Sequence, residues 1–194
     1  MAFQNLNIEA FKAQFKRGAR ANLFYVQVQA PVILSALGVD VPENTFEFFC
    51  KGAKLPKNAV GSADVKYMGH TMPFVGDPSH DHDLPLVILN EEDFRCKNFI
   101  DKWVQLCHHP ILGTSTTSTV YEGRVTVTQL DGLGNAIRTV VFHHGFFNDS
   151  GDIELSWDNE NQIEIFTANF KYAYHTNAAT IDFSVSGLIT AIGG

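Results

Sequence analysis

The sequence lacks the run of about 18 apolar residues that a membrane-spanning helix requires. Its N-terminus carries charged residues where a signal peptide has an apolar segment, so we expect neither a membrane span nor secretion. Basic residues are also scarce, because 14 Lys and Arg stand against 21 Asp and Glu, for a net charge of −7. A general nucleic-acid-binding protein needs a basic surface, and this composition argues against that class.

Cysteine is scarce, and common catalytic motifs are absent. Cys50, Cys96 and Cys107 are odd in number and form no CxxC motif, which favours buried thiols in a reducing compartment. No GxSxG, GxGxxG or P-loop is present, and no cysteine is accompanied by an identifiable activating histidine. The sequence therefore offers no starting residue for nucleophilic or phosphate chemistry.

Eight histidines suggest a metal site, and residues 80–83 (His-Asp-His-Asp) are the richest cluster. A cupin-type site would need a Glu shortly after the HxH, yet the next carboxylate belongs to Glu91 at a helix start. The adjacent pairs at 108–109 and 143–144 do not present two ligands together. A solvated loop is the favoured interpretation of residues 80–83. A metal-dependent β-barrel enzyme that uses this cluster is the alternative from another functional class.

One amphipathic helix is well marked. Asn90 is the expected N-cap, and Asp93 completes a variant capping box three residues later. The apolar residues that follow lie on one arc at helical spacing, and polar residues lie opposite. Pro110 ends the helix, because proline disfavours helical geometry in the preceding residue. A strand at residues 84–89 is predicted to turn directly into this helix.

Most of the remaining chain has the alternation typical of β-strands. The sixteen Phe residues also suit β-sheet cores. The segments 120–130 and 136–147 are predicted to form a hairpin around the turn at residues 131–134. We therefore predict a single domain, mainly β, in which one helix packs against β-sheets. The other predicted strands cover residues 22–29, 45–53, 163–175 and 180–188.

Three segments have no obvious packing partner within the chain. Residues 5–17 place apolar side chains at near-helical spacing, as a short amphipathic helix or docking arm would. Residues 31–44 form an elaborated turn with an apolar patch. Residues 56–83 are too long for a structureless loop, so we expect a projecting hairpin with strands at Val65–Met68 and Thr71–Val75. Such segments indicate assembly with other chains.

Blocks along most of residues 19–174 carry a family resemblance. They are Ala19–Phe24 leading into Val26 and Val28, Phe48–Lys51, Leu55–Pro56, Tyr67–Met68, Val75–Asp77, Asn90–Phe99 with Asp101 and Trp103 and, most specific, Leu155–Asp158 followed by Asn161, Ile163, Phe166 and Tyr174. In these residues the chain resembles the tail tube proteins of T4-like contractile-tailed bacteriophages. The resemblance implies a two-sheet β-sandwich or barrel with one flanking helix, related to the Hcp tube of type VI secretion.

The resemblance also implies an organisation and a function. Six copies would join strands into a shared inner β-barrel, and these hexameric rings would stack head to tail. Residues 1–194 would form one tail tube domain with an N-terminal arm (1–18), a projecting hairpin arm (56–83) and a C-terminal extension (175–194). The chain would be a structural subunit of the inner tail tube in the virion, assembled in the host cytoplasm. It would be neither an enzyme nor a cofactor-binding protein.

The partners that the resemblance implies are copies of the chain itself, the tail sheath protein, a tape measure protein inside the tube before ejection, and baseplate and tail terminator proteins. DNA would only pass through the conduit during ejection. The alternatives within the same fold are a baseplate tube initiator and the inner tube of a phage-derived contractile injection system.

Candidate site residues follow from these implied roles. A channel must let DNA slide, so we expect an acidic or neutral lumen, because each basic side chain on phosphate adds attraction. Polar strand faces supply the lumen candidates Gln27, Gln29, Thr126 and Thr128. The subunit-interface candidates are Lys54, Leu55, Pro56, Val65, Tyr67, Met68, Phe74 and Val75 of the hairpin arm and its base, and Phe11 and Phe15 of the N-terminal arm.

Overall fold

The computed structural model describes residues 8–15, 18–42, 46–79, 81–111, 113–157 and 162–177. Their helices are α1 (Ile8–Gln14), α2 (Val32–Ala36), α3 (Phe46–Phe49), α4 (Arg95–Cys107) and α5 (Ser118–Tyr121). Their strands are β1 (Phe24–Gln29), β2 (Cys50–Ala53), β3 (Ala59–Tyr67), β4 (His70–Ser79), β5 (Asp83–Leu89), β6 (Gly123–Leu130), β7 (Ala136–Asp149), β8 (Ile165–Lys171) and β9 (Tyr174–Asn177). The predicted fold class, mainly β with one substantial helix, is confirmed.

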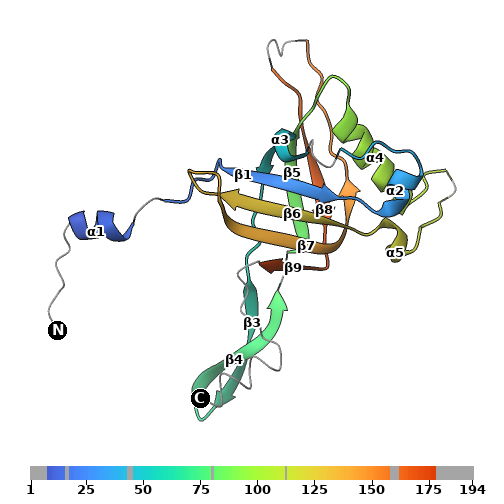
Figure 1. Ribbon diagram of the computed structural model, residues 1–194. Coiled ribbons are helices and arrows are strands. Elements are labelled where there is room, and N and C mark those ends of the chain that lie inside the picture. The colour runs from blue at the N-terminus through green and yellow to red at the C-terminus, as the bar shows by residue number, and fades with distance from the viewer. Residues whose placement is uncertain are drawn as a thin grey trace.

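Seven strands form a continuous hydrogen-bonded sheet in the order β1-β6-β7-β8-β5-β2, and β9 also pairs with β7. The first part of β7 pairs with β6 and β9, whereas its end, from Phe146 onward, pairs with β8. The sheet therefore has two halves, β1-β6-β7-β9 and β7-β8-β5-β2, and their strands cross in Figure 1. Strands β3 and β4 form a separate hairpin that projects from this body.

Strand β7 passes from one half to the other at His144 and Gly145. His144 has φ of 52°, a left-handed conformation that few non-glycine residues adopt. A Cβ atom on Gly145 would lie 2.3 Å from the Phe170 ring and 2.4 Å from the carbonyl oxygen of Lys171. Glycine at this position allows β8 to approach β7 closely, which lets one strand serve both halves.

The two halves and α4 enclose a single hydrophobic core. Trp103 of α4 lies within it, with ring centroids 5.2–6.2 Å from those of Phe99, Phe147 and Phe170. Its indole Nε1 donates a hydrogen bond to the Tyr121 carbonyl oxygen at 2.8 Å. In the half formed by β7, β8, β5 and β2, paired residues of β5 and β8 point to the same side and are buried together. These pairs are Leu84 with Phe170, Leu86 with Ala168 and Ile88 with Phe166.

The predicted start of the long helix is wrong. The helix begins at Arg95 rather than directly after Asn90, and no side chain caps it. The Asn90 side chain instead donates to Glu164 Oε2 at 2.7 Å, and the Asn90 backbone extends the ladder between β5 and β8. A turn follows, closed by Phe94 N donating to Glu91 O, and Phe94 takes φ of 53° before the helix begins.

Other predicted boundaries also differ from the structure. The strand predicted at residues 45–53 begins as helix α3 and becomes β2 only at Cys50, and the turn at 31–44 contains α2. The strand predicted at 163–175 is interrupted between β8 and β9. The hairpin at 120–147 is confirmed from Gly123 onward, while α5 replaces its first residues. The strand predicted at 180–188 lies outside the described residues.

Candidate functional site

The hairpin formed by β3 and β4 is the largest feature that the body does not cover. The predicted hairpin is present, and its strands are longer than expected. Nearly every residue of both strands is exposed, on both faces. At its tip Met68 and Gly69 have φ of 47° and 80°, the pair of positive φ values that a type I′ turn requires. The turn therefore makes the register specific without help from the body.

The pairing of the hairpin gives it two unlike faces. Residues that pair directly share a face, as do alternate residues along each strand. One face carries Ala63 opposite Phe74, Val65 opposite Met72 and Tyr67 opposite His70. The other face carries Ser62 opposite Val75, Asp64 opposite Pro73 and Lys66 opposite Thr71. The interface candidates Val65, Tyr67 and Phe74 thus lie on one apolar face, Met68 is at the tip, and Val75 lies on the polar face.

The remaining interface candidates lie at the base of the hairpin and in α1. The Lys54 side chain is exposed, whereas Leu55 is half-buried and packs against the core. Pro56 is half-buried. The rings of Phe11 in α1 and of Phe15, which follows its last residue, stack with centroids 5.2 Å apart, and both side chains are exposed. Figure 1 shows α1 standing away from the body.

The lumen candidates share one face of the β1-β6-β7-β9 half-sheet. Gln27 pairs with Thr126, and Gln29 pairs with Arg124, so these side chains lie opposite the buried valines of the same strands. Gln27 Nε2 also donates to Glu47 Oε1 at 2.6 Å. Thr128 lies on this face by register, but only 2% of it is exposed, and its Oγ1 is 3.4 Å from Thr139 Oγ1.

The face therefore carries Gln, Thr and Tyr side chains and few charges. Arg124 is exposed on it, and His143 belongs to it because it alternates with Val141, the partner of Thr126. Burial, Arg124 and His144 lower the pKa of His143, which favours its neutral form. His143 Nε2 lies 2.8 Å from Thr176 Oγ1 of β9. The Glu47 carboxylate also meets this face, through its hydrogen bond with Gln27.

The cluster at residues 80–83 is built as an ion-paired loop in its described part. Asp83 Oδ1 lies 2.8 Å from Lys171 Nζ, and the hydrogen bonds from Lys171 and Asn169 lower the pKa of Asp83. Asp81 Oδ1 lies 3.5 Å from Lys57 Nζ. Within the described residues, no group of three or more His, Cys, Asp and Glu side chains could hold a metal ion. His80 lies outside the described residues.

The three cysteines behave as structural thiols. Cys50 and Cys96 are buried, and Cys107 is half-buried. Burial raises the pKa of Cys50 and of Cys107 to about 11, and that of Cys96 to about 12. Because the thiolate is the reactive form, none of the three is a nucleophile at neutral pH.

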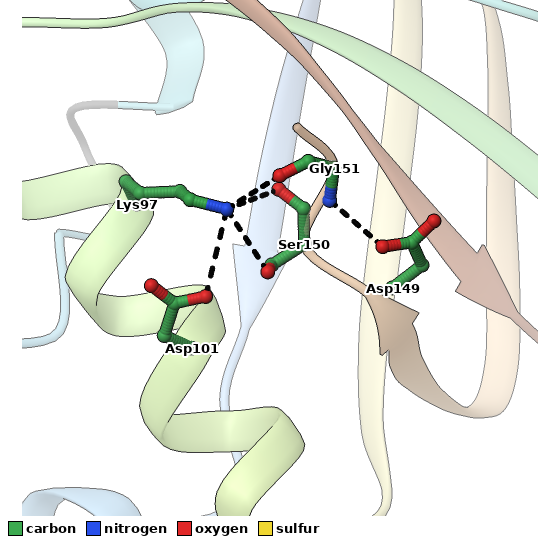
Figure 2. Close-up of polar contacts among 5 residues, drawn as sticks. All are labelled: Lys97, Asp101, Asp149, Ser150 and Gly151. Atoms are coloured by element: carbon green, nitrogen blue, oxygen red, sulfur yellow. Dashed lines mark hydrogen bonds and ion pairs between the residues drawn. The ribbon is translucent and has the colours of Figure 1, made fainter. Parts of the chain in front are cut away.

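Sequence reasoning did not identify a further exposed surface, the acidic ledge, which consists of residues 149–157 and 162–165. Figure 2 shows how α4 holds the first residues of the ledge. Lys97 Nζ donates to the carbonyl oxygens of Ser150 and Gly151 at 2.8 and 2.7 Å, and lies 3.6 Å from Asp101 Oδ1. Gly151 N donates to Asp149 Oδ1 at 2.9 Å. A concentration of acidic residues around exposed apolar ones was the available sequence signal.

Comparison with known proteins shows which family the chain belongs to. Residues 19–178 match the family of sequences described as phage tail tube proteins. The chain belongs to the phage tail tube protein family. It is thus a structural protein of the phage virion's tail. The tail tube protein gp19 of Enterobacteria phage T4 is 24% identical over 160 residues, which are 80% of this chain and 90% of that protein.

Solved structures share the fold. A chain in the baseplate of the anti-feeding prophage superposes with a TM-score of 0.59 at 13% identity, covering 83% of this chain and 95% of that one. A chain in the sheath-tube complex of PVC, an extracellular contractile injection system, in its extended state, superposes with a TM-score of 0.55 at 11% identity, covering 87% and 97%. No helix in the described part of the tail tube chain is long and apolar enough to cross a membrane.

Proposed function

We propose that six copies of this chain close into a ring whose inner wall is one β-barrel, and that rings stack into the hollow inner tube of a contractile tail. The observation that carries the proposal is the half-sheet β1-β6-β7-β9, in which β1 and β9 are the outer strands among the described residues. Unpaired strand edges favour pairing with other chains. Joining β9 of one copy to β1 of the next satisfies the hydrogen-bonding groups of both edges. The copies form a closed ring when the rotation between neighbours adds up to a full turn.

The hairpin arm supports the same proposal. An isolated two-stranded hairpin is marginally stable in water, and this one exposes an apolar face made by Val65, Tyr67, Met72 and Phe74. A neighbouring copy that covers this face would remove it from water. The arm points away from the body beyond β9, on the side where the next copy would join (Figure 1).

The mainly polar, weakly charged face of the half-sheet suits a conduit. In the proposed ring this face, with Gln27, Gln29 and Thr126, lines the lumen. Glutamine and threonine contribute no counterion-releasing contacts with phosphate, so DNA could slide past them during ejection. Arg124 is the exception on the described face, and it lies next to His143 at one end of the sheet. Thr128 is proposed as a wall residue rather than a contact residue, since it is buried.

The proposed partners follow from this role. They are further copies of the chain, a surrounding sheath protein, baseplate and terminator proteins at the tube ends, and a tape measure protein inside the tube before ejection. We infer no catalytic activity and no cofactor, because the titratable groups described above serve in ion pairs, turns or the core. Metal analysis of purified protein tests the enzyme alternative, which stoichiometric zinc or iron would favour.

A baseplate tube initiator is the second candidate function, because the fold is shared with a chain of the anti-feeding prophage baseplate. Copy number separates the two roles. A main tube subunit is present in many rings per virion, whereas an initiator is present in one. Quantitative mass spectrometry of virions measures this ratio against the sheath protein.

Negative-stain electron microscopy of the purified chain at high concentration tests the proposal. We expect rings or hollow tubes with six-fold symmetry. A chain that stays monomeric at all concentrations, or that forms solid fibres without a central channel, would contradict it. The single-domain organisation, with arms at residues 1–18 and 56–83, predicts that deleting residues 60–80 leaves a folded monomer that no longer forms tubes.

A further inference from the structure

The acidic ledge belongs to the most acidic stretch of the sequence. Residues 149–164 contain six Asp and Glu and no Lys, Arg or His. Asp152 and Glu154 are exposed, and within the described residues neither makes an ion pair. A surface of this charge repels acidic partners and attracts basic ones.

The same ledge exposes large apolar side chains. Trp157 is fully exposed, at 102% of its reference area, and Leu155 and Ile163 are also exposed. Tryptophan is a typical anchor residue at protein interfaces. Apolar residues clustered this way on a soluble protein mark a contact surface rather than a solvated loop. In Figure 1 the ledge and the hairpin arm lie at opposite ends of the body.

The base of the ledge is held rigidly. Lys97 fixes the carbonyl groups of residues 150 and 151, and its side chain is only 16% exposed (Figure 2). Gly151 has φ of 67°, and a Cβ atom there would lie 2.2 Å from the carbonyl oxygen of Thr167 in β8. Ile153 packs against the core. A surface that is already ordered before binding loses less conformational entropy when a partner docks.

The N-terminal arm has the complementary chemistry. Residues 1–20 contain Lys12, Lys16, Arg17 and Arg20 against a single acid, Glu9. On α1 and the residue after it, the exposed Ile8, Phe11 and Phe15 lie on one arc at helical spacing, and Lys12 falls beside them. The arm therefore presents an apolar stripe flanked by positive charge, and the ledge presents apolar residues flanked by negative charge.

Another groove on the molecule is apolar but has unsuitable charge. It is lined by Val32 and Ile33 of α2 and by Arg124 and His144. Its acid, Glu122, is already occupied, because Oε2 lies 2.8 Å from Nδ1 of His144. Docking of α1 there would bring Lys12 close to Arg124, whereas docking on the ledge would bring it close to Asp152 or Glu154.

We propose that the N-terminal arm of one copy docks on the acidic ledge of another copy, with Phe11 and Phe15 against Trp157 and Leu155 and with Lys12 beside Glu154. This inference rests on the proposed self-assembly and assigns one of its contacts. The exposed arm and the exposed ledge are then each other's partners. Each copy donates its arm to one neighbour and receives the arm of another. The contact holds copies together in addition to strand joining.

Disulfide trapping between full-length chains tests the contact. One preparation carries Lys12→Cys and is isotopically labelled, and the other carries Glu154→Cys. The two are mixed, assembled, oxidised and analysed by mass spectrometry. We expect a cross-link between labelled and unlabelled chains. A Val32→Cys chain in place of Glu154→Cys is the matched control for the α2 groove and should not cross-link, and the unsubstituted chain controls for the three native thiols.

The outcomes separate this inference from the proposed function. Tubes without the cross-link, or a cross-link to Val32→Cys instead, would overturn the docking proposal while leaving the tube intact. The absence of any assembly by the unsubstituted chain would overturn both. Charge reversal provides an independent readout: Lys12→Glu and Glu154→Lys should each raise the concentration needed for assembly severalfold, and the double variant should restore it. Failure of the double variant to restore assembly would contradict the pairing.

Discussion

The body, formed by the seven-stranded sheet and α4, and the hairpin arm, formed by β3 and β4, are both built from paired strands, but the strands of the body are buried on one side and those of the arm are exposed. In β5 every second residue is buried, and its partners in β8 are buried with it. In β3 and β4 nearly all residues are exposed, although the two strands pair continuously from the pair of Ser62 and Val75 to the turn. Turn chemistry and backbone pairing are thus enough to define the arm, whereas packing stabilises the body.

The energetic consequence of this contrast is large. Burying a large apolar side chain contributes about 1.5–3 kcal/mol relative to leaving it exposed. Phe166 and Phe170 of the body gain that stabilisation within one chain. Phe74 and Tyr67 of the arm stay exposed among the described residues, and in the proposed assembly a neighbouring copy covers them. We therefore expect the arm to be the part of the fold whose stability depends on assembly.

The largest expected effect is in the core. Trp103→Ala should lower the free energy of unfolding by about 3–5 kcal/mol, because it removes a fully buried ring and leaves a cavity. Urea denaturation followed by circular dichroism measures the change. The matched control is Trp157→Ala, an exposed position where we expect a change within about 0.5 kcal/mol. Equal losses at the two tryptophans would contradict the division between body and surface.

Substitutions at two glycines with positive φ, one in the body and one in the arm, allow the two regions to be compared. Gly151→Ala should destabilise the protein by about 1–3 kcal/mol, because the left-handed backbone is strained for alanine and the methyl group meets Thr167. Gly69→Ala, at the arm's turn with φ of 80°, has open space around the new methyl group. Its strain should loosen the hairpin locally. It should lower the temperature of global unfolding less than Gly151→Ala does. A larger global loss at Gly69 would mean that the arm folds as part of the body.

The pH dependence sharpens the account of the body. The pKa of His143 is lowered in the folded state, so below pH of about 6.5 the unfolded chain binds more protons than the folded one. Stability should therefore fall as the pH drops through this range, and level off below the folded pKa. His143→Gln should flatten that part of the profile. A slope that survives the substitution would show that another group is responsible.

The smallest expected effect on folding is in the arm. Phe74→Ser should change the free energy of unfolding by less than about 0.5 kcal/mol, because the side chain is exposed in the single chain. The same substitution should block tube formation as seen by electron microscopy. Phe170→Ser in the body is the matched control, and it should unfold the chain instead. A Phe74→Ser variant that forms normal tubes would remove the role assigned to the arm.

Features set by local chemistry were predictable from the sequence. The alternation of Val26 and Val28 marks β1, and the turn at residues 131–134 marks the hairpin of β6 and β7. There Asp131 Oδ1 accepts from the backbone N–H groups of Leu133 and Asn135, which lower the pKa of Asp131. The hairpin arm was also predictable, because proline and glycine ruled out a long helix in that segment.

Features decided by distant residues were not predictable. Asn90 has the chemistry of an N-cap, but Glu164 of the neighbouring segment takes its side chain, so the helix begins at Arg95. Phe46 has high strand propensity, yet it lies in α3, where its ring packs 5.7 Å from Phe99. The interface candidates were grouped by segment, whereas only the register shows that Val65 of β3 shares a face with Phe74 of β4.

Amide hydrogen exchange of the arm, measured before and after assembly, is the most direct test of the central claim that the single chain is incomplete. In dilute monomer we expect the amides of residues 59–79 to exchange rapidly, while those of β5 and β8 are protected. In tubes we expect strong protection of the arm as well. An arm that is equally protected in the monomer, or that remains unprotected in tubes, would contradict the account.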